Sequence, residues 1–164
     1  MKKFKKLAAC LLVAVMALAM FTACGRTPLD IQYDEAKKAD GVAALSQYFS
    51  QTDKTPMVAD EKMEKAAHNG LEPAIAYLCG RVSKVNSAIE IWSKSGMTQS
   101  ELEACYNEHR YVKIVIPESQ YSQQLVYAYL SDAMANVNAA VEPTKYGMEA
   151  ATYNGNVYIA MFMM

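Results

Sequence analysis

The chain has 164 residues, of which 52% are hydrophobic and 20% are charged, and its formal net charge is −1 at pH 7. All 17 acidic residues follow residue 23, whereas four of the 16 basic residues lie in the opening MKKFKK, so the part after residue 23 is mildly acidic. Because that part has no Lys/Arg cluster, the composition excludes the basic surface that nucleic-acid binding requires. About 140 residues remain there, enough for one domain with its own core.

The first 23 residues have the organisation of an export signal. The basic opening is followed by LAACLLVAVMALAMFTA, residues 7–23, in which Thr22 is the only polar side chain. A helix that spans a bilayer needs roughly 20 apolar residues, whereas the apolar region of a signal peptide is shorter, follows a basic region and ends in small residues. We therefore expect residues 1–23 to be a signal peptide.

The end of this segment, FTAC at residues 21–24, resembles the lipobox of bacterial lipoproteins. The resemblance implies that Cys24 is thioether-linked to a diacylglycerol and becomes the new N-terminus after cleavage. It also implies a membrane partner through the lipid and a location on the extracytoplasmic face of the cell envelope, because two or three acyl chains hold a protein stably on a membrane. The alternatives are an ordinary signal peptide or an uncleaved anchor, in which Cys24 has no such role.

Residues 24–33 contain Gly and Pro without a periodic pattern, so we expect a short tether between the lipid and a domain over residues 34–164. The apolar spacing predicts a first helix over residues 34–50. A second helix is expected to open at Asp60, to be ended or interrupted at Asn69-Gly70, and to restart at Pro73.

Two helices and a strand are predicted in the next part of the chain. Thr98 followed by Glu101 is a capping box, which predicts a short helix over residues 99–108. YVKIVIPES, residues 111–119, is rich in β-branched residues and predicts a strand. Residues 122–138 have the most regular helical spacing in the chain.

The last twenty residues predict a β-hairpin that turns at Asn154-Gly155, since both residues tolerate the positive φ of a type I′ turn. In its second strand the side chains of both faces are apolar, and such a strand is most stable in the middle of a sheet that helices cover on both sides. The predicted fold class is therefore α+β, an α-β-α sandwich with a small, mainly antiparallel sheet between helical layers.

Two stretches resemble the CAP superfamily, also called SCP-like, of cysteine-rich secretory proteins, antigen 5 and pathogenesis-related 1 proteins. TPMVADEKMEKAA matches a family segment through Pro56, Asp60, Ala66 and Ala67. The final stretch from Tyr129 matches through the positions Tyr129, Ser131, Pro143 and Gly147. The resemblance covers about residues 34–164 and implies the same α-β-α sandwich.

The residues that give this family its chemistry are missing. Family members that keep their cleft place two His and two acids there, but this chain has Met134 where the second His is expected and Lys113 near the position of an acid. Neither side chain can replace a metal-binding imidazole or a carboxylate base. Met134, Tyr129 and Lys113 therefore mark a degenerate cleft, and we expect no catalytic residues, metal or cofactor.

The cysteine and histidine residues offer few further candidates for a disulfide or a metal site. Cys79 and Cys105 could form a disulfide in an exported protein, or could be ordinary buried thiols. His68 is expected in the last turn of its helix and His109 at a solvated helix end, and neither histidine lies near another metal ligand in the sequence.

Three functions are compatible with these features. The leading hypothesis is a lipid-anchored, non-enzymatic CAP-like module that contacts a protein, peptide or glycan ligand at the cell envelope. The second is an envelope hydrolase that acts on peptide or cell-wall material through His68 or His109 paired with Glu101 or Glu108. The third is a purely structural envelope component.

Overall fold

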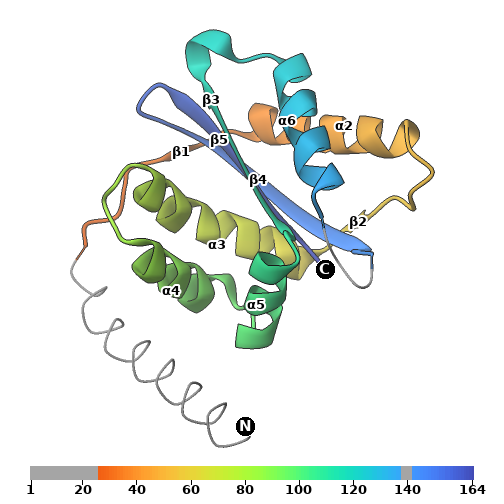
Figure 1. The fold of residues 1–164 in the computed structure, drawn as a ribbon. Coiled ribbons are helices and arrows are strands. Elements are labelled where there is room, and N and C mark those ends of the chain that lie inside the picture. The colour runs from red at the N-terminus through yellow and green to blue at the C-terminus, as the bar shows by residue number, and fades with distance from the viewer. Residues whose placement is uncertain (1–25, 138–141) are drawn as a thin grey trace, which may run out of the picture.

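The computed structural model describes residues 26–137 and 142–164, so Cys24 and the signal segment lie outside the described residues. Helices and one small sheet make up this part of the chain (Figure 1). In chain order the elements are β1 (Gln32–Tyr33), α2 (Glu35–Ser50), β2 (Val58–Ala59), α3 (Glu61–Leu78), α4 (Lys84–Ser95), α5 (Gln99–Asn107), β3 (Tyr111–Pro117), the 3₁₀ turn η1 (Glu118–Gln120), α6 (Gln123–Ala135), β4 (Lys145–Tyr153) and β5 (Asn156–Met163).

The sheet is mainly antiparallel and has the strand order β1-β4-β5-β3, with the short β2 pairing parallel to β4. The hairpin between β4 and β5 turns at Asn154 and Gly155, which have φ values of 50° and 73°. These positive φ values are those that the Asn-Gly pair predicts, because both residues adopt the left-handed region at low cost. The predicted hairpin is confirmed.

Strand β5 lies in the interior of the sheet and is buried on both faces. One set of alternate side chains, from Val157 to Met163, packs in a core with α2 and α6. The other set, which includes Tyr158, Ala160 and Phe162, packs against α3 and its neighbours. Figure 1 shows α2 and α6 on one side of the sheet and α3, α4 and α5 on the other. The prediction of a small sheet between two helical layers is confirmed.

Helix α3 runs without a break from Glu61 to Leu78, so the predicted interruption at Asn69-Gly70 is wrong. A Gly and a Pro inside a helix cost about 1 and about 3 kcal/mol, respectively. The buried face that includes Leu71 and Ile75 crosses this stretch without a gap, and each such side chain contributes about 2 kcal/mol on burial. Packing therefore outweighs local propensity.

Helix α4 was not among the predicted elements, although its signals are present in the sequence. Ser83 is its N-cap and accepts a hydrogen bond from the Asn86 N–H, and Gly96 ends it with φ of 70°. It packs along α3, where Gly70 is close to Ile91 and Phe162: a Cβ at Gly70 would lie 3.4 Å from a side-chain carbon of each. None of the helices within residues 26–137 and 142–164 has the length and apolar character needed to span a bilayer.

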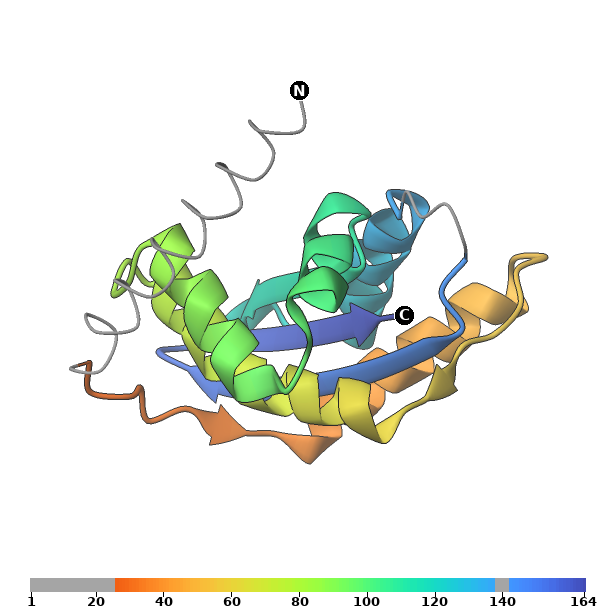
Figure 2. The ribbon, with the colours of Figure 1, turned by 90° about the horizontal axis from the view of Figure 1, so that it is seen from below.

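Residues 26–33, which we call the N-terminal segment, are packed on the domain and are not a free tether. Gln32 and Tyr33 form β1 and pair with Thr152 and Ala151 at the edge of β4. The chain then turns into α2, and the Asp34 N–H donates to the carbonyl of Ala150. In Figures 1 and 2 this segment crosses the same end of the molecule as the turn between α3 and α4. The structural domain therefore begins no later than Arg26.

Candidate functional site

Met134, Tyr129 and Lys113 do not form one cleft, so this prediction is corrected. Met134 is buried on the face of α6 that packs on the sheet, whereas Tyr129, five residues earlier on the same helix, is 48% exposed. Five residues rotate a helix by about 140°, which places the two side chains on different sides. Lys113 is an exposed residue of β3 whose neighbours in the strand, Val112 and Ile114, point toward α6. Lys113 therefore lies on the opposite face of the sheet.

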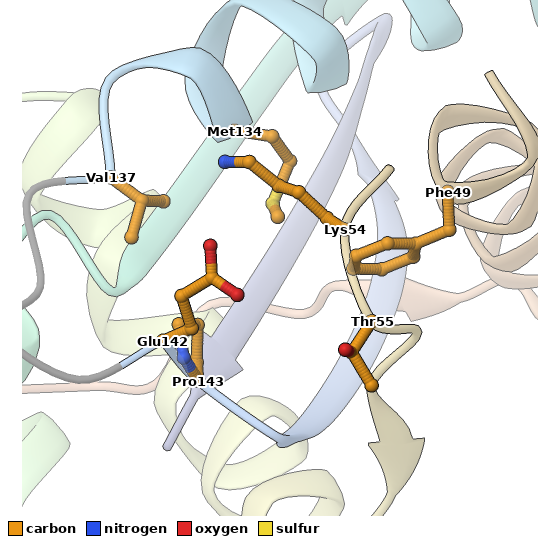
Figure 3. Close-up of a pocket in the computed structure, with 7 residues that line it drawn as sticks. All are labelled: Phe49, Lys54, Thr55, Met134, Val137, Glu142 and Pro143. Carbon is orange, nitrogen blue, oxygen red and sulfur yellow. The ribbon is translucent and has the colours of Figure 1, made fainter. Parts of the chain in front are cut away.

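Met134 instead lines a small pocket of about 100 Å³, which we call the Met134 pocket (Figure 3). It lies where the ends of α2 and α6 meet the residues that lead into β2 and β4. Figure 3 shows the Lys54 and Glu142 side chains extending into the space between Val137 and the Phe49 ring. The complete lining is Phe49, Lys54, Thr55, Met134, Val137, Glu142 and Pro143.

The lining of the Met134 pocket mixes apolar side chains with the Thr55 hydroxyl and with one positive and one negative charge. Sites for drug-sized ligands usually measure about 300–1,000 Å³, so this pocket holds a group the size of one side chain. Phe49 and Met134 are both buried and supply ring and thioether surface. The ammonium of Lys54 lies 5.9 Å from the centre of the Tyr48 ring, within the range of a weak cation–π contact. This arrangement suits a small apolar group that carries a polar or charged end.

Besides the Met134 pocket, the structure contains a polar cluster centred on Glu149, a buried residue of β4. Its Oε2 lies 2.8 Å from Nδ1 of His68 on α3, and its Oε1 accepts a hydrogen bond from the Ala150 N–H. The His68 ring is half-exposed and stacks on Tyr33, with ring centres 4.2 Å apart. A carboxylate that holds one imidazole nitrogen fixes the ring and leaves Nε2 to contact another molecule. No local pattern in the sequence predicts this pair, because its two members are 81 residues apart.

Glu101 and Glu108, which the hydrolase hypothesis pairs with the histidines, have other partners. Glu101 binds Lys62 at 2.6 Å and closes the capping box of α5, and the hydrogen bond from Lys62 lowers the pKa of Glu101. Glu108 pairs with Arg110. His68 lies in the interior of α3 and not at its end, because that helix continues beyond Gly70. The His–Glu pairs that the hydrolase hypothesis named are therefore not formed.

Cys79 and Cys105, the cysteines within the described residues, are free thiols, and the possible disulfide between them is not formed. Cys79 is exposed at the end of α3, where its Sγ lies 3.7 Å from the Tyr158 hydroxyl. Cys105 is buried in the core beneath α5 with Phe162, and burial raises the pKa of its thiol to about 11. Cys79 lies at the end of α3 beside Tyr158 and Cys105 lies in the core beneath α5, so the two thiols have different neighbours and do not pair.

The N-terminal segment is fixed by a mostly buried ion cluster between α3 and α4. The guanidinium of Arg26 binds both carboxylate oxygens of Glu72, at 2.6 and 2.8 Å, and both of Glu90, at 3.2 and 2.7 Å. Glu72 also accepts from the Leu29 N–H at 2.8 Å, and Lys94 lies 3.4 Å from Glu72. One cation therefore joins the start of the described chain to two helices.

The cluster determines the ionisation of Glu72. Burial alone would raise the pKa of this carboxyl, but the hydrogen bonds from Arg26 and Leu29 outweigh burial and hold the pKa below its ordinary value of 4.5. A native pKa below the unfolded value means that ionised Glu72 stabilises the fold above about pH 4.5, and that this contribution is lost as the pH falls.

One feature of the sequence points to the acidic residues of these two clusters. Glu72, Glu90 and Glu149 each lie within an apolar run, and a carboxylate in such a place requires a partner. The sequence does not say which partner, because Arg26 and Glu90 are 64 residues apart and His68 and Glu149 are 81 apart.

Within the described residues, no three His, Cys, Asp or Glu side chains come together in a group that could hold a metal ion. Comparison of the chain with known protein families, with curated protein sequences and with solved structures finds no match in any of the three.

We predict that Arg26→Met lowers the free energy of unfolding at pH 7 by about 3 kcal/mol, because it leaves two buried carboxylates without their main cation. Lys62→Met is the matched control, since it removes an exposed pair with Glu101 and should cost less than about 1 kcal/mol.

Urea denaturation at pH 7 and below pH 4 measures both variants. The cost of Arg26→Met should shrink in acid, as Glu72 becomes protonated, whereas equal costs for the two variants at pH 7 would contradict the role of the cluster.

Proposed function

We propose that this chain is a lipid-anchored protein on the extracytoplasmic face of the membrane, and that its CAP-like domain is a non-enzymatic module for binding a protein, peptide or glycan group. The proposed anchor is supported by the basic opening, the 17-residue apolar region and the FTAC that ends at Cys24. The lipid fixes the protein at the envelope, so its ligand is expected there.

The CAP-like assignment is supported by the structural roles of the residues that resemble the family. Asp60 is the N-cap of α3, and Ala66 and Ala67 are completely buried where that helix packs on the sheet. Gly147 allows the closest approach of all, because a Cβ there would lie 1.9 Å from backbone atoms of Met63 and Glu64. The residues that match the family therefore lie where helix α3 begins and where it packs closely on the sheet. For this reason we propose the family's α-β-α arrangement.

The observation that carries the binding function is the Met134 pocket. Its lining presents a thioether, a phenyl ring and aliphatic carbon, with Lys54 and Glu142 as its charged groups. A thioether cannot remove or deliver a proton, so the position of Met134 favours contact with a ligand over reaction with it. The ligand group that fits best is one apolar side chain or acyl group beside a charge or an amide.

We predict that the native protein carries a diacylglyceryl group on Cys24 and fractionates with membranes. Cys24→Ser removes the sulfur to which the lipid is attached, and the variant should keep its leader or appear in soluble fractions. Mass spectrometry of native material measures the modification directly. An unmodified Cys24, or a leader still joined to it, would overturn the anchor.

We predict that the Met134 pocket contacts its ligand in intact cells. A photo-cross-linking residue at Thr55, at the pocket, should give a defined adduct, whereas the same residue at Ser100, exposed on α5, should not. Reversing both charges, with Lys54→Glu and Glu142→Lys, should remove the adduct while the protein stays in the membrane fraction. Absence of an adduct at Thr55 would favour a purely structural envelope component.

A hydrolase is the second candidate function, and the His68–Glu149 pair is the observation that favours it. A carboxylate-oriented imidazole is a common general base and contributes about 10²–10⁴-fold to a rate. If the protein is a hydrolase, His68→Gln and Glu149→Gln should lower kcat on cell-wall fragments or peptides by that factor, and His109→Gln should not. Our proposal predicts no turnover above the uncatalysed rate for the native protein or for any of the three variants.

A further inference from the structure

The turn between α3 and α4 carries an exposed apolar and basic surface, which we call the turn patch. Among the described residues it includes large apolar side chains that are well exposed: Leu78 at 44%, Val85 at 54% and Val115 at 38%. Leu78, Val115 and Lys113 border one shallow hollow, and the charge of Lys84 acts on Lys113. We define the turn patch as the exposed residues Leu78, Arg81, Lys84 and Val85 at the turn and the adjoining helix ends, together with Lys113 and Val115 of β3.

The turn patch is positively charged in a chain that is otherwise acidic. Between Glu72 and Glu90 the sequence has no acid, and its charged residues are Arg81 and Lys84. The two flanking glutamates are themselves bound by Arg26. Lys113 lies 5.5 Å from the centre of the Tyr77 ring and 5.7 Å from that of Tyr111. Aliphatic side chains mixed with Lys, Arg and Tyr are typical of surfaces that lie in a membrane interface.

The start of the described chain is bound to the two helices that flank this turn. Arg26 is held against α3 and α4, and Cys24 precedes it by only two residues, which span at most about 7 Å of extended chain. Figures 1 and 2 both show the start of the N-terminal segment at the end of the molecule where α3 turns into α4. A lipid on Cys24 would therefore bring this end of the domain to the bilayer surface.

We propose that the turn patch rests on the anionic headgroups of the membrane, with Arg81, Lys84 and Lys113 at the phosphates and Leu78 and Val85 among the upper acyl carbons. This inference rests on the proposed lipid attachment at Cys24. It sets the orientation of the domain, because the Met134 pocket lies on the other face of the sheet, at the far ends of α2 and α6. The membrane would hold the end at the turn patch, and the Met134 pocket is built from residues on the opposite side of the sheet.

Cys79 provides a native reporter for this orientation. It is a free, exposed thiol between Leu78 and Arg81, whereas Cys105 is buried and Cys24 is proposed to carry the lipid. The mature lipidated protein is reconstituted in vesicles of phosphatidylcholine with about 30 mol % phosphatidylglycerol. The rate at which a charged, membrane-impermeant maleimide modifies Cys79 is then compared between detergent micelles and vesicles. For each variant we take the ratio of its modification rate in vesicles to its rate in detergent. A substitution that changes the intrinsic reactivity of the Cys79 thiol affects both rates and does not change this ratio.

We expect modification of Cys79 to be about ten-fold slower in these vesicles than in detergent, since contact with lipid excludes the reagent. The double variant Arg81→Glu, Lys84→Glu should lose this protection while still sedimenting with the vesicles. The matched control Lys38→Glu, Lys65→Glu makes the same charge change on α2 and α3, away from the turn patch, and should keep the protection.

Two results would overturn the inference, and a third would overturn the lipid attachment on which it rests. Native protein that sediments with the vesicles but is modified at the detergent rate would show that the domain does not rest on the turn patch. Equal protection in pure phosphatidylcholine would contradict the part assigned to the basic residues. Failure of the native protein to sediment at all would instead overturn the lipid attachment, so the two proposals fail in different ways.

Discussion

The apolar character of both faces of β5 is the constraint on which the rest of this structure depends. A strand that carries apolar side chains on both sides leaves water only when helices cover both sides, and each buried side chain of the size of Ile or Met contributes about 2 kcal/mol. Helices α2 and α6 cover one face, and α3 covers the other with α4 and α5 around it. The position of every other element, including the partners of the N-terminal segment, follows from this arrangement.

The buried ions add specificity to this hydrophobic arrangement. A charge cluster such as Arg26 with Glu72 and Glu90 contributes little net stability relative to apolar packing, because its desolvation is costly, but breaking it is expensive. It therefore fixes where the N-terminal segment lies on the two helices. If Cys24 is lipidated, that fixed position limits how the domain can be oriented relative to the membrane.

Local sequence signals predicted the elements that local interactions determine. The capping box of Thr98 and Glu101 and the Asn154-Gly155 hairpin are both formed, and the two-faced pattern of β5 gave its central place in the sheet. The continuity of α3 was missed, because packing of its buried face overrides the Gly and the Pro. The charge pairs were missed because their members are far apart in the sequence. The lipobox and the CAP-like family stay predictions.

The ion pairs of Arg26 with Glu72 and Glu90 also affect how a protease could release the domain if Cys24 is lipidated. A trypsin-like protease must take the guanidinium of its target arginine into its own pocket, but that of Arg26 is held by two glutamates. A cut beyond it, between Thr27 and Leu29, would release a fragment with Glu72 and Glu90 deprived of their main cation. If Cys24 is lipidated, release of the domain with this ion cluster intact would therefore require cleavage between Cys24 and Arg26.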